Sequence, residues 1–150
     1  MSLSCTDETG RFVRRPADPS MGTAQGAAIL PLFRDDRSDK RRLARSIQSA
    51  RRIRNSLWNV ELFADPAWDL LLDLYVRHLE SRRTGISAAC DAANVPMTTA
   101  LRWIGKLEQE GLAIRLQDWR DGRRTLVSLT DDGVQRMDRY FEALQERRVA

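Results

Sequence analysis

The chain has 150 residues, of which 42% are hydrophobic and 31% are charged, with a formal net charge of +4 and a pI near 9.7. This length suits one domain with appendages, and the apolar fraction can fill one modest core. The most apolar run, residues 24–33, falls well short of the roughly 20 residues of a membrane span and is interrupted by Gln25, Gly26 and Pro31. We therefore expect a soluble, cytoplasmic protein with no membrane partner.

The positive charge is concentrated in two segments. Residues 39–62 contain seven basic and two acidic residues, a surplus of five, and residues 111–130 contain four basic and two acidic residues, a surplus of two. A local surplus of this kind is compatible with binding to nucleic acid, although charge runs on helices are usually solvated faces.

The residues that carry most enzyme chemistry are sparse. Cys5 and Cys90 lie in different settings without metal-ligand spacing, which suits a reducing compartment. His78 is the single histidine and has no Cys or Ser partner at a suggestive spacing, so a structural role is favoured. The sequence also lacks a phosphate-binding glycine loop and paired catalytic carboxylates. We predict no catalytic residue, no cofactor and no metal site.

The N-terminal part divides into an arm and a helix. Residues 1–38 mix Gly, Pro, Ser, Asp and Arg with little periodicity, which predicts a flexible arm. The apolar cluster at residues 29–33 is alternatively suited to a short docking segment. Residues 39–62 then carry an apolar stripe at steps of three and four, which predicts a helix. The stripe consists of Leu43, Ile47, Ala50, Ile53, Leu57 and Val60. Its aliphatic character favours dimerisation, and its basic face is alternatively suited to DNA phosphates.

A second helix is expected from Pro66. Asp65 is a good N-cap, and proline suits the first helical position because no N–H is needed there. Its apolar residues cover so much of the circumference that the helix should be covered on more than one side. They are Trp68, Leu70, Leu71, Leu72, Leu74, Tyr75 and Leu79.

The remaining elements follow in the order of a winged helix-turn-helix. We expect a short strand at residues 84–86, a small helix capped by Ser87, a turn at 94–96 and a second helix from Met97 or Thr98 to Glu110. Gly111 suits a left-handed helix end. Strands at 112–117 and 125–129 flank a charged tip, residues 118–124, whose Asp121-Gly122 pair is a hairpin signal. Thr130 caps a last helix.

The predicted fold is mainly α with a small β-hairpin wing. A winged helix-turn-helix at residues 63–130 is flanked by dimerisation helices at residues 39–62 and 131–150. The last helix carries the apolar stripe Val134, Met137, Phe141 and Leu144.

The second helix of the predicted pair is suited to the major groove of DNA, because its inner face can pack while its outer face reads bases. The inner face holds Ala100, Trp103, Ile104 and Leu107, so we expect Trp103 in the core. The outer face holds Met97, Thr98, Thr99, Arg102 and Lys106. Arg102 suits a bidentate contact with guanine, and Lys106 suits a phosphate.

The predicted wing supplies a second set of contacts. An arginine on a narrow hairpin can enter the minor groove, where the negative potential is enhanced. The candidates are Arg120, Asp121, Arg123 and Arg124, with Asp121 expected to hold Arg123 extended by a charge-assisted pair. Trp119 either covers the base of the wing or faces a partner, and the covering role is favoured.

Two segments resemble the MarR type of transcriptional regulator. The run Val95-Pro-Met-Thr-Thr-Ala-Leu-Arg-Trp-Ile-Gly-Lys-Leu-Glu-Gln-Glu-Gly-Leu is similar to the recognition helix of that family, and Asp121-Gly-Arg-Arg-Thr-Leu-Val-Ser-Leu-Thr-Asp-Asp-Gly is similar to its wing. The resemblance implies a homodimer with intertwined terminal helices on a palindromic site. It implies Arg123 as the minor-groove arginine, Asp121 as its partner, and Thr98, Thr99 and Arg102 in the major groove. Pro96 departs from the serine usual in the family.

The sequence therefore predicts a homodimeric, sequence-specific regulator that binds duplex DNA. A winged-helix module for protein interaction, with DNA binding secondary, is the alternative, and the wing arginines favour DNA. The residues identify no small-molecule effector. The expected dimer contact comprises Leu43, Ile47, Ile53, Leu57, Val60, Met137, Phe141 and Leu144.

Overall fold

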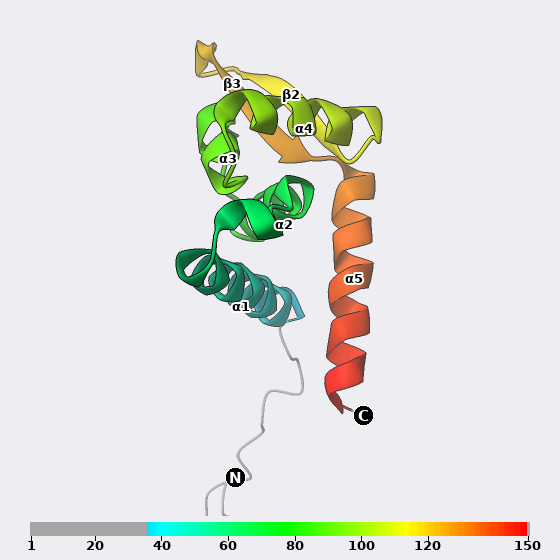
Figure 1. The fold of residues 1–150 in the computed structure, drawn as a ribbon. Helices are drawn as coiled ribbons and strands as arrows, with labels where there is room; N and C mark the ends of the chain where they lie inside the picture. Colours follow the sequence, from blue (N-terminus) through cyan, green and yellow to red (C-terminus); the bar gives the residue numbers. More distant parts are fainter. Residues whose placement is uncertain (1–35, 150) are drawn as a thin grey trace, which may run out of the picture. The chain divides into compact units, whose positions relative to one another are not determined.

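A computed structural model describes residues 36–149, and the predicted docking segment at 29–33 and most of the predicted arm lie outside them. The elements are α1 (Asp36–Leu57), η1 (Val60–Phe63), α2 (Pro66–Leu79), β1 (Thr84–Gly85), α3 (Ile86–Ala92), α4 (Met97–Gln109), β2 (Ala113–Asp118), β3 (Asp121–Leu129) and α5 (Asp131–Val149). The strands form one antiparallel sheet in the order β1-β3-β2. This mainly helical fold with a hairpin wing confirms the predicted fold class (Figure 1).

The first helix differs from the prediction at both ends. It begins at Asp36 and ends at Leu57, whereas residues 39–62 were expected. Asn59 adopts an extended backbone and its side-chain oxygen accepts the N–H of Glu61 at 3.0 Å, which caps the separate η1 turn. Because asparagine competes in this way for backbone donors, Val60 lies in η1 and outside the stripe of α1.

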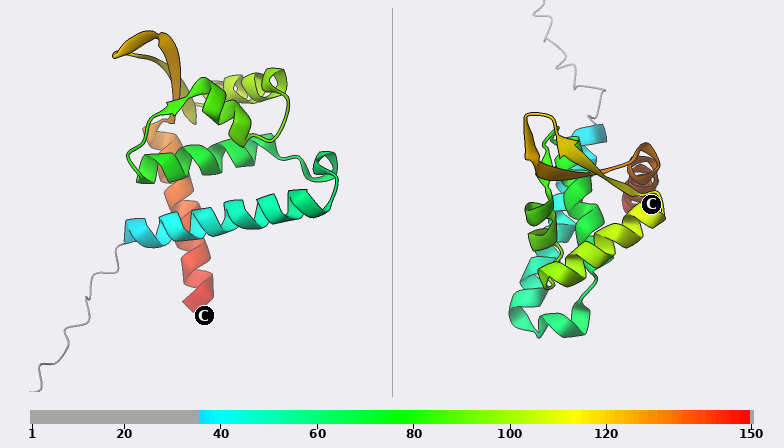
Figure 2. Two further views of the ribbon diagram at one scale, coloured as in Figure 1. Left: turned by 90° about the vertical axis from the view of Figure 1, so that its left-hand side faces the viewer. Right: turned by 90° about the horizontal axis from the view of Figure 1, so that it is seen from above.

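Helix α2 is central, as its apolar circumference predicts. The side chain of Asp65 accepts the N–H of Trp68, and Pro66 occupies the first turn. Leu70, Leu72 and Tyr75 are fully buried. The helix lies between α1 on one side and the α3–α4 pair on the other (Figure 2). Burying a leucine of this kind contributes about 2 kcal/mol to folding.

Ion pairs join α1 to α2 and α5. The buried ammonium of Lys40 lies 2.8 Å from Asp36, 3.4 Å from Asp138 and 2.8 Å from Glu142, and the Tyr75 hydroxyl donates to Asp138 at 2.5 Å. Burial alone would lower the pKa of Lys40, but its hydrogen bonds to the carboxylates raise that pKa above its ordinary value. Burial and the bond to Asp138 raise the pKa of Tyr75.

Several arginines of α1 are likewise bound within the chain. Arg37 donates to the carbonyls of His78 and Leu79 at the end of α2, Arg45 pairs with Glu80, and Arg51 donates to Asp69 at 2.5 Å. The hydrogen bond from Arg45 lowers the pKa of Glu80. Two arginines of the basic face predicted for the first helix, Arg45 and Arg51, therefore attach α1 to α2 and its C-terminal end.

A tight corner joins the end of α4 to the start of α5. Gly111 is left-handed with φ of 69°, as predicted. The Thr130 hydroxyl donates to the carbonyl of Gly111 at 2.6 Å and accepts the N–H of Gly133 at 3.0 Å, so Thr130 caps α5. A Cβ on Gly133 would lie 2.2 Å from the carbonyl oxygen of Leu112, which leaves room for glycine alone.

Two local predictions were wrong. Helix α3 begins at Ile86 with Gly85 as its N-cap, and no side chain caps it, so Ser87 is not the cap. The hairpin turn consists of Trp119 and Arg120 rather than Asp121-Gly122. The side chain of Asp118 accepts the N–H of Arg120 at 3.0 Å and so fixes the turn earlier.

Candidate nucleic-acid interface

The outer face of α4 presents the predicted set of side chains. Met97, Thr98, Arg102 and Lys106 are exposed, and Thr99 is half-buried. The opposite face is fixed by its packing, since Ala100, Ile104 and Leu107 are buried in the core. Pro96 supplies no side-chain cap, so no side chain occupies the N–H groups of the first turn. A helix end of this kind attracts anions.

Trp103 and Lys106 share one site on α4. Trp103 is partly buried and packs against the core, as expected, although one part of its ring remains accessible. The Lys106 ammonium lies 4.1 Å from the centroid of that ring. A cation in this position is attracted by the face of the indole. The lysine is thereby held at the edge of the outer face.

Helix α4 is joined to the wing by a forked ion pair. The Arg115 guanidinium on β2 lies 2.6 Å from Glu108, and its backbone N–H also donates to Glu108 at 3.1 Å. The guanidinium lies 3.6 Å from the position that a Cβ on Gly105 would occupy. This is an ordinary van der Waals distance, so Arg115 lies against the helix at Gly105. This pair fixes the root of the wing relative to α4.

Some exposed arginines in the described chain have no side-chain partner, among them Arg41 and Arg52 on α1, Arg139 on α5, and three residues on α4 and the wing. Within residues 36–149, Arg102, Arg123 and Arg124 make no side-chain hydrogen bond or ion pair, and all three are exposed. Asp121 accepts the backbone N–H of Arg123 at 3.1 Å, so the carboxylate fixes the backbone rather than the guanidinium that we expected it to hold. The guanidinium of Arg123 is consequently available to a phosphate or a groove.

Trp119 lies at the hairpin turn with 75% of its surface exposed. The guanidinium carbons of Arg120 and Arg83 lie 4.9 Å and 5.4 Å from its ring centroid. Such exposure does not fit a residue that is buried beneath the wing. Instead, the ring lines one side of an open hollow.

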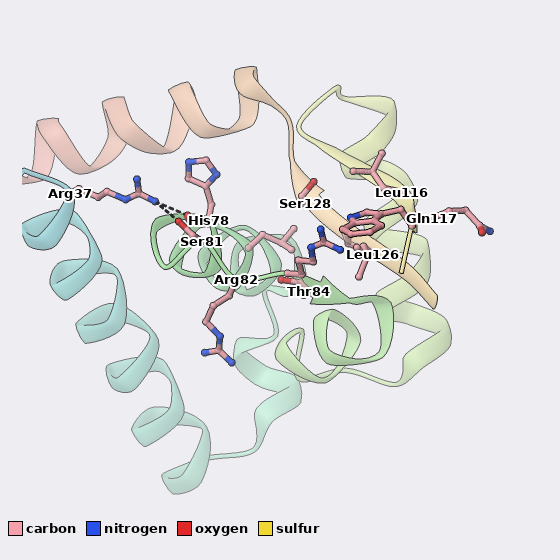
Figure 3. Close-up of a pocket in the computed structure, with 13 residues that line it drawn as sticks. Arg37, His78, Ser81, Arg82, Thr84, Leu116, Gln117, Leu126 and Ser128 are labelled. Atoms are coloured by element: carbon pink, nitrogen blue, oxygen red, sulfur yellow. Dashed lines mark hydrogen bonds between the residues drawn. The ribbon is translucent and has the colours of Figure 1, made fainter. Parts of the chain in front are cut away.

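This hollow lies between the base of the wing and the end of α2 (Figure 3). Its volume is about 450 Å³. Arg37 reaches from α1 toward Ser81 at its rim, and the hydrogen bond between them is 3.3 Å long. Its lining includes Arg83, Leu116, Trp119 and Leu126. Sequence reasoning missed this hollow, because residues 81–84 and the wing meet only through the fold.

The predicted dimer residues divide into two groups. Leu43, Met137 and Phe141 are buried in the core of their own chain, and Ile47 and Leu144 pack against that core. In contrast, Ile53 and Leu57 are exposed by 61% and 66%. Three further exposed apolar residues continue from the end of α1 through η1, and the periodicity of a single helix missed them. They are Trp58, Leu62 and Phe63.

The described residues suggest neither metal binding nor a membrane span. Within residues 36–149, no group of three or more His, Cys, Asp or Glu side chains is placed to hold a metal ion. In the same part of the chain, no helix is both long and apolar enough to cross a membrane.

Comparison with solved structures identifies the fold. No protein-family model matches the chain, and no curated protein matches it. The S. aureus MepR-DNA complex superposes with a TM-score of 0.51 at 21% identity, covering 71% of this chain and 85% of that chain. The structural neighbours are winged-helix transcription regulators of the MarR family, so the resemblance predicted from the sequence is confirmed for the fold.

Two further structures match less closely. S. aureus MepR bound to ethidium bromide has a TM-score of 0.47 at 20% identity and covers 57% of this chain and 61% of that chain. A mutant MepR from a multidrug resistant S. aureus clinical isolate has a TM-score of 0.42 at 24% identity and covers 47% of this chain and 49% of that chain. The chain thus spans about half to three fifths of these two relatives.

Proposed function

We propose that this protein is a sequence-specific regulator that binds duplex DNA as a homodimer. Helix α4 lies in the major groove, and Arg123 at the tip of the wing enters the minor groove. The observation that carries the proposal is the pairing of arginines. Arg37, Arg45 and Arg51 of α1 are bound to carboxylates or carbonyls at α2, whereas Arg102 on α4 and Arg123 and Arg124 on the wing face solvent without a side-chain partner in the described chain, as do Arg41 and Arg52 of α1.

The distribution of charge supports DNA as the ligand. An arginine without an internal partner can exchange its water for a phosphate or a base without breaking a protein contact, and each phosphate contact releases a counterion. Thr98 and Arg102 on the exposed face of α4 provide the hydroxyl and fork that suit base edges. The fold shared with a DNA-bound winged-helix protein is consistent with this use.

A homodimer is supported by the apolar surface at the end of α1. Ile53, Leu57, Leu62 and Phe63 are all at least 40% exposed, and they lie in α1 and η1. Several large exposed apolar side chains on adjoining elements are typical of an interaction site. We retain Ile53 and Leu57 from the predicted contact, and we assign Leu43, Met137 and Phe141 to the core of each subunit.

A protein-interaction module remains the second candidate, and one observation favours it. Ile114 and Leu116 on β2 are 42% and 48% exposed beside Trp119. These residues form an apolar face on the wing that a DNA phosphate would not use. A protein partner on this face would shield Ile114 and Leu116 from solvent, whereas DNA would shield the outer face of α4. The two kinds of binding can therefore be distinguished.

Selection of bound sequences from a random duplex pool tests the proposed function. We expect a symmetric site with half-site centres about 10 bp apart, bound with an affinity that falls steeply with salt. The same binding should be measured with single-stranded DNA as the control. Equal enrichment of all sequences together with no dependence on salt would contradict the proposal.

A further inference from the structure

The outer part of the wing receives little support from the rest of the fold. Strand β1 pairs only with Val127 and Leu126 of β3, so the hairpin beyond them is a ribbon of two strands. A two-stranded ribbon is marginally stable alone. Trp119 at the turn of this ribbon lines the hollow and is 75% exposed, so packing does not fix the direction of the ribbon.

One ion pair reaches this ribbon from outside the hairpin. The Arg83 guanidinium, immediately before β1, donates to the Asp118 carboxylate at 3.0 Å. The same carboxylate oxygen accepts the N–H of Arg120 in the turn at 3.0 Å. The Asp118 side chain is only 8% exposed, and the register of the ladder shifts between Gln117 and Asp118. The contact is therefore made at the point where the ribbon bends.

The position of Arg83 is itself fixed. The chain leaves α2 through Ser81, which is left-handed with φ of 54°, and the N–H of Arg82 donates to the carbonyl of Arg77 at 2.9 Å. Arg37 of α1 binds the same turn through the carbonyls of His78 and Leu79. Residues 81–83 thus form a rigid support from which Arg83 reaches the wing.

We propose that Arg83 and Asp118 are positioning residues that aim the tip of the wing at the minor groove. This inference rests on the proposed function, because the direction of the wing matters only if Arg123 contacts DNA. Neither residue touches DNA in this proposal. Asp118 acts through the turn that it holds. Arg83 acts through Asp118 and through the Trp119 ring in the same turn, whose centroid lies 5.4 Å from its guanidinium carbon.

The test uses Asp118→Asn and Arg83→Gln in the full chain, with the duplex selected from the random pool. Asparagine retains an acceptor for the Arg120 N–H but removes the charge that Arg83 binds. Asp132→Asn is the matched control, because Asp132 pairs with Arg136 on the exposed surface of α5. We expect Asp118→Asn and Arg83→Gln each to weaken binding between about 3-fold and about 30-fold, and Arg83→Lys to restore part of the loss.

Two readouts distinguish positioning from general damage to the fold. Hydroxyl-radical footprinting, which reads the sugars along the minor groove, should show lost protection flanking the site. Dimethyl sulfate footprinting should show that guanine N7 remains protected in the major groove. In an Arg123→Ala background, Asp118→Asn should add less than about 2-fold, because the arginine that it aims is gone. Loss of both protections together, or full additivity, would overturn the inference.

The two proposals fail in different ways. If the natural protein does not bind duplex DNA, the proposed function is wrong and the role of Arg83 and Asp118 is wrong with it. If the natural protein binds and Arg83→Gln keeps full protection in the minor groove, only the positioning role is wrong. Since Arg83 is half exposed, its glutamine variant should fold even if Asp118→Asn does not.

Discussion

Glu108 on α4 binds Arg115 on β2 through both the guanidinium and the backbone N–H of the arginine. One carboxylate therefore connects the helix proposed to read the major groove with the first strand of the wing. The pair is partly exposed, with side-chain exposures of 28% and 39%. Exposed pairs contribute little to stability, but a forked arginine contributes geometric precision.

Glu108→Gln should therefore change DNA binding more than folding. We expect the free energy of unfolding in urea to fall by no more than about 1 kcal/mol. The same variant should lose affinity for the selected duplex, because helix and wing can then move independently. Glu110→Gln, at an exposed position on the same helix end, is the control. Equal affinity for Glu108→Gln and the natural protein would show that the pair has no role in alignment.

Arg102 and Lys106 should differ in the kind of binding that they supply. Arg102→Ala should cost roughly 1–3 kcal/mol at one guanine and relax specificity at that base pair. Lys106→Ala should weaken binding to every sequence alike and reduce the slope of affinity against salt. Competition with single-base variants of the selected site measures both. A uniform loss for Arg102→Ala would make it a phosphate contact instead.

Arg123→Ala should weaken binding broadly, because the guanidinium at the tip has no other partner within residues 36–149. The loss should be largest on duplexes with A·T-rich flanks, whose narrow minor groove has the strongest negative potential. Gel-shift titration against A·T-rich and G·C-rich flanks measures this. Unchanged affinity for both duplexes would show that Arg123 does not contribute to DNA binding.

Leu57→Asp should separate the proposed homodimer into monomers that remain folded. Leu57 is 66% exposed in the single chain, so a charge there is solvated in the monomer but unpaired and costly when buried between subunits. Ser46→Asp, at an exposed position earlier in α1, is the control. Light scattering gives the mass of each variant. A Leu57→Asp protein that still scatters as a dimer would place the contact elsewhere.

Alkaline pH should weaken the junction of α1, α2 and α5. Because the pKa of Lys40 and the pKa of Tyr75 are both raised on folding, the folded protein holds these protons more tightly than the unfolded chain. The stability that they contribute is complete below the unfolded pKa values, near 10, and is lost as the pH rises through the folded values. Melting temperatures above pH 9 should fall less steeply for Tyr75→Phe than for the natural protein.

Local sequence signals predicted much of this fold. Some element boundaries depend on the local chemistry of one or two residues, and these predictions were confirmed. Asp65 and Pro66 begin α2, Gly111 follows the end of α4, and Thr130 caps α5. The end of α1 was not predicted, because the apolar period continues through Asn59 while the backbone does not. The apolar periodicity shows which face of a helix is apolar. It does not show where a side chain such as that of Asn59 accepts a backbone N–H and ends the helix.

The candidate interface was predictable only in part. Side chains on one helix face follow from spacing, so the exposed positions of Arg102 and Lys106 agreed with expectation. The pairing of Arg83 with Asp118 spans 35 residues and depends on where the left-handed Ser81 directs the chain. Similarly, the pattern of residues 131–150 could not reveal whether Phe141 would pack within its own chain or against another.

The corner formed by Gly111, Leu112, Thr130 and Gly133 has a mechanical consequence. The α-carbon of Gly133 packs closely against the Leu112 carbonyl, and the Thr130 hydroxyl bridges Gly111 and Gly133, so this corner is rigid. A rigid corner transmits a rotation of one helix to the other. A partner that tilts α5 should therefore tilt the end of α4 as well, and in the proposed homodimer this tilt would change the spacing between the two α4 helices.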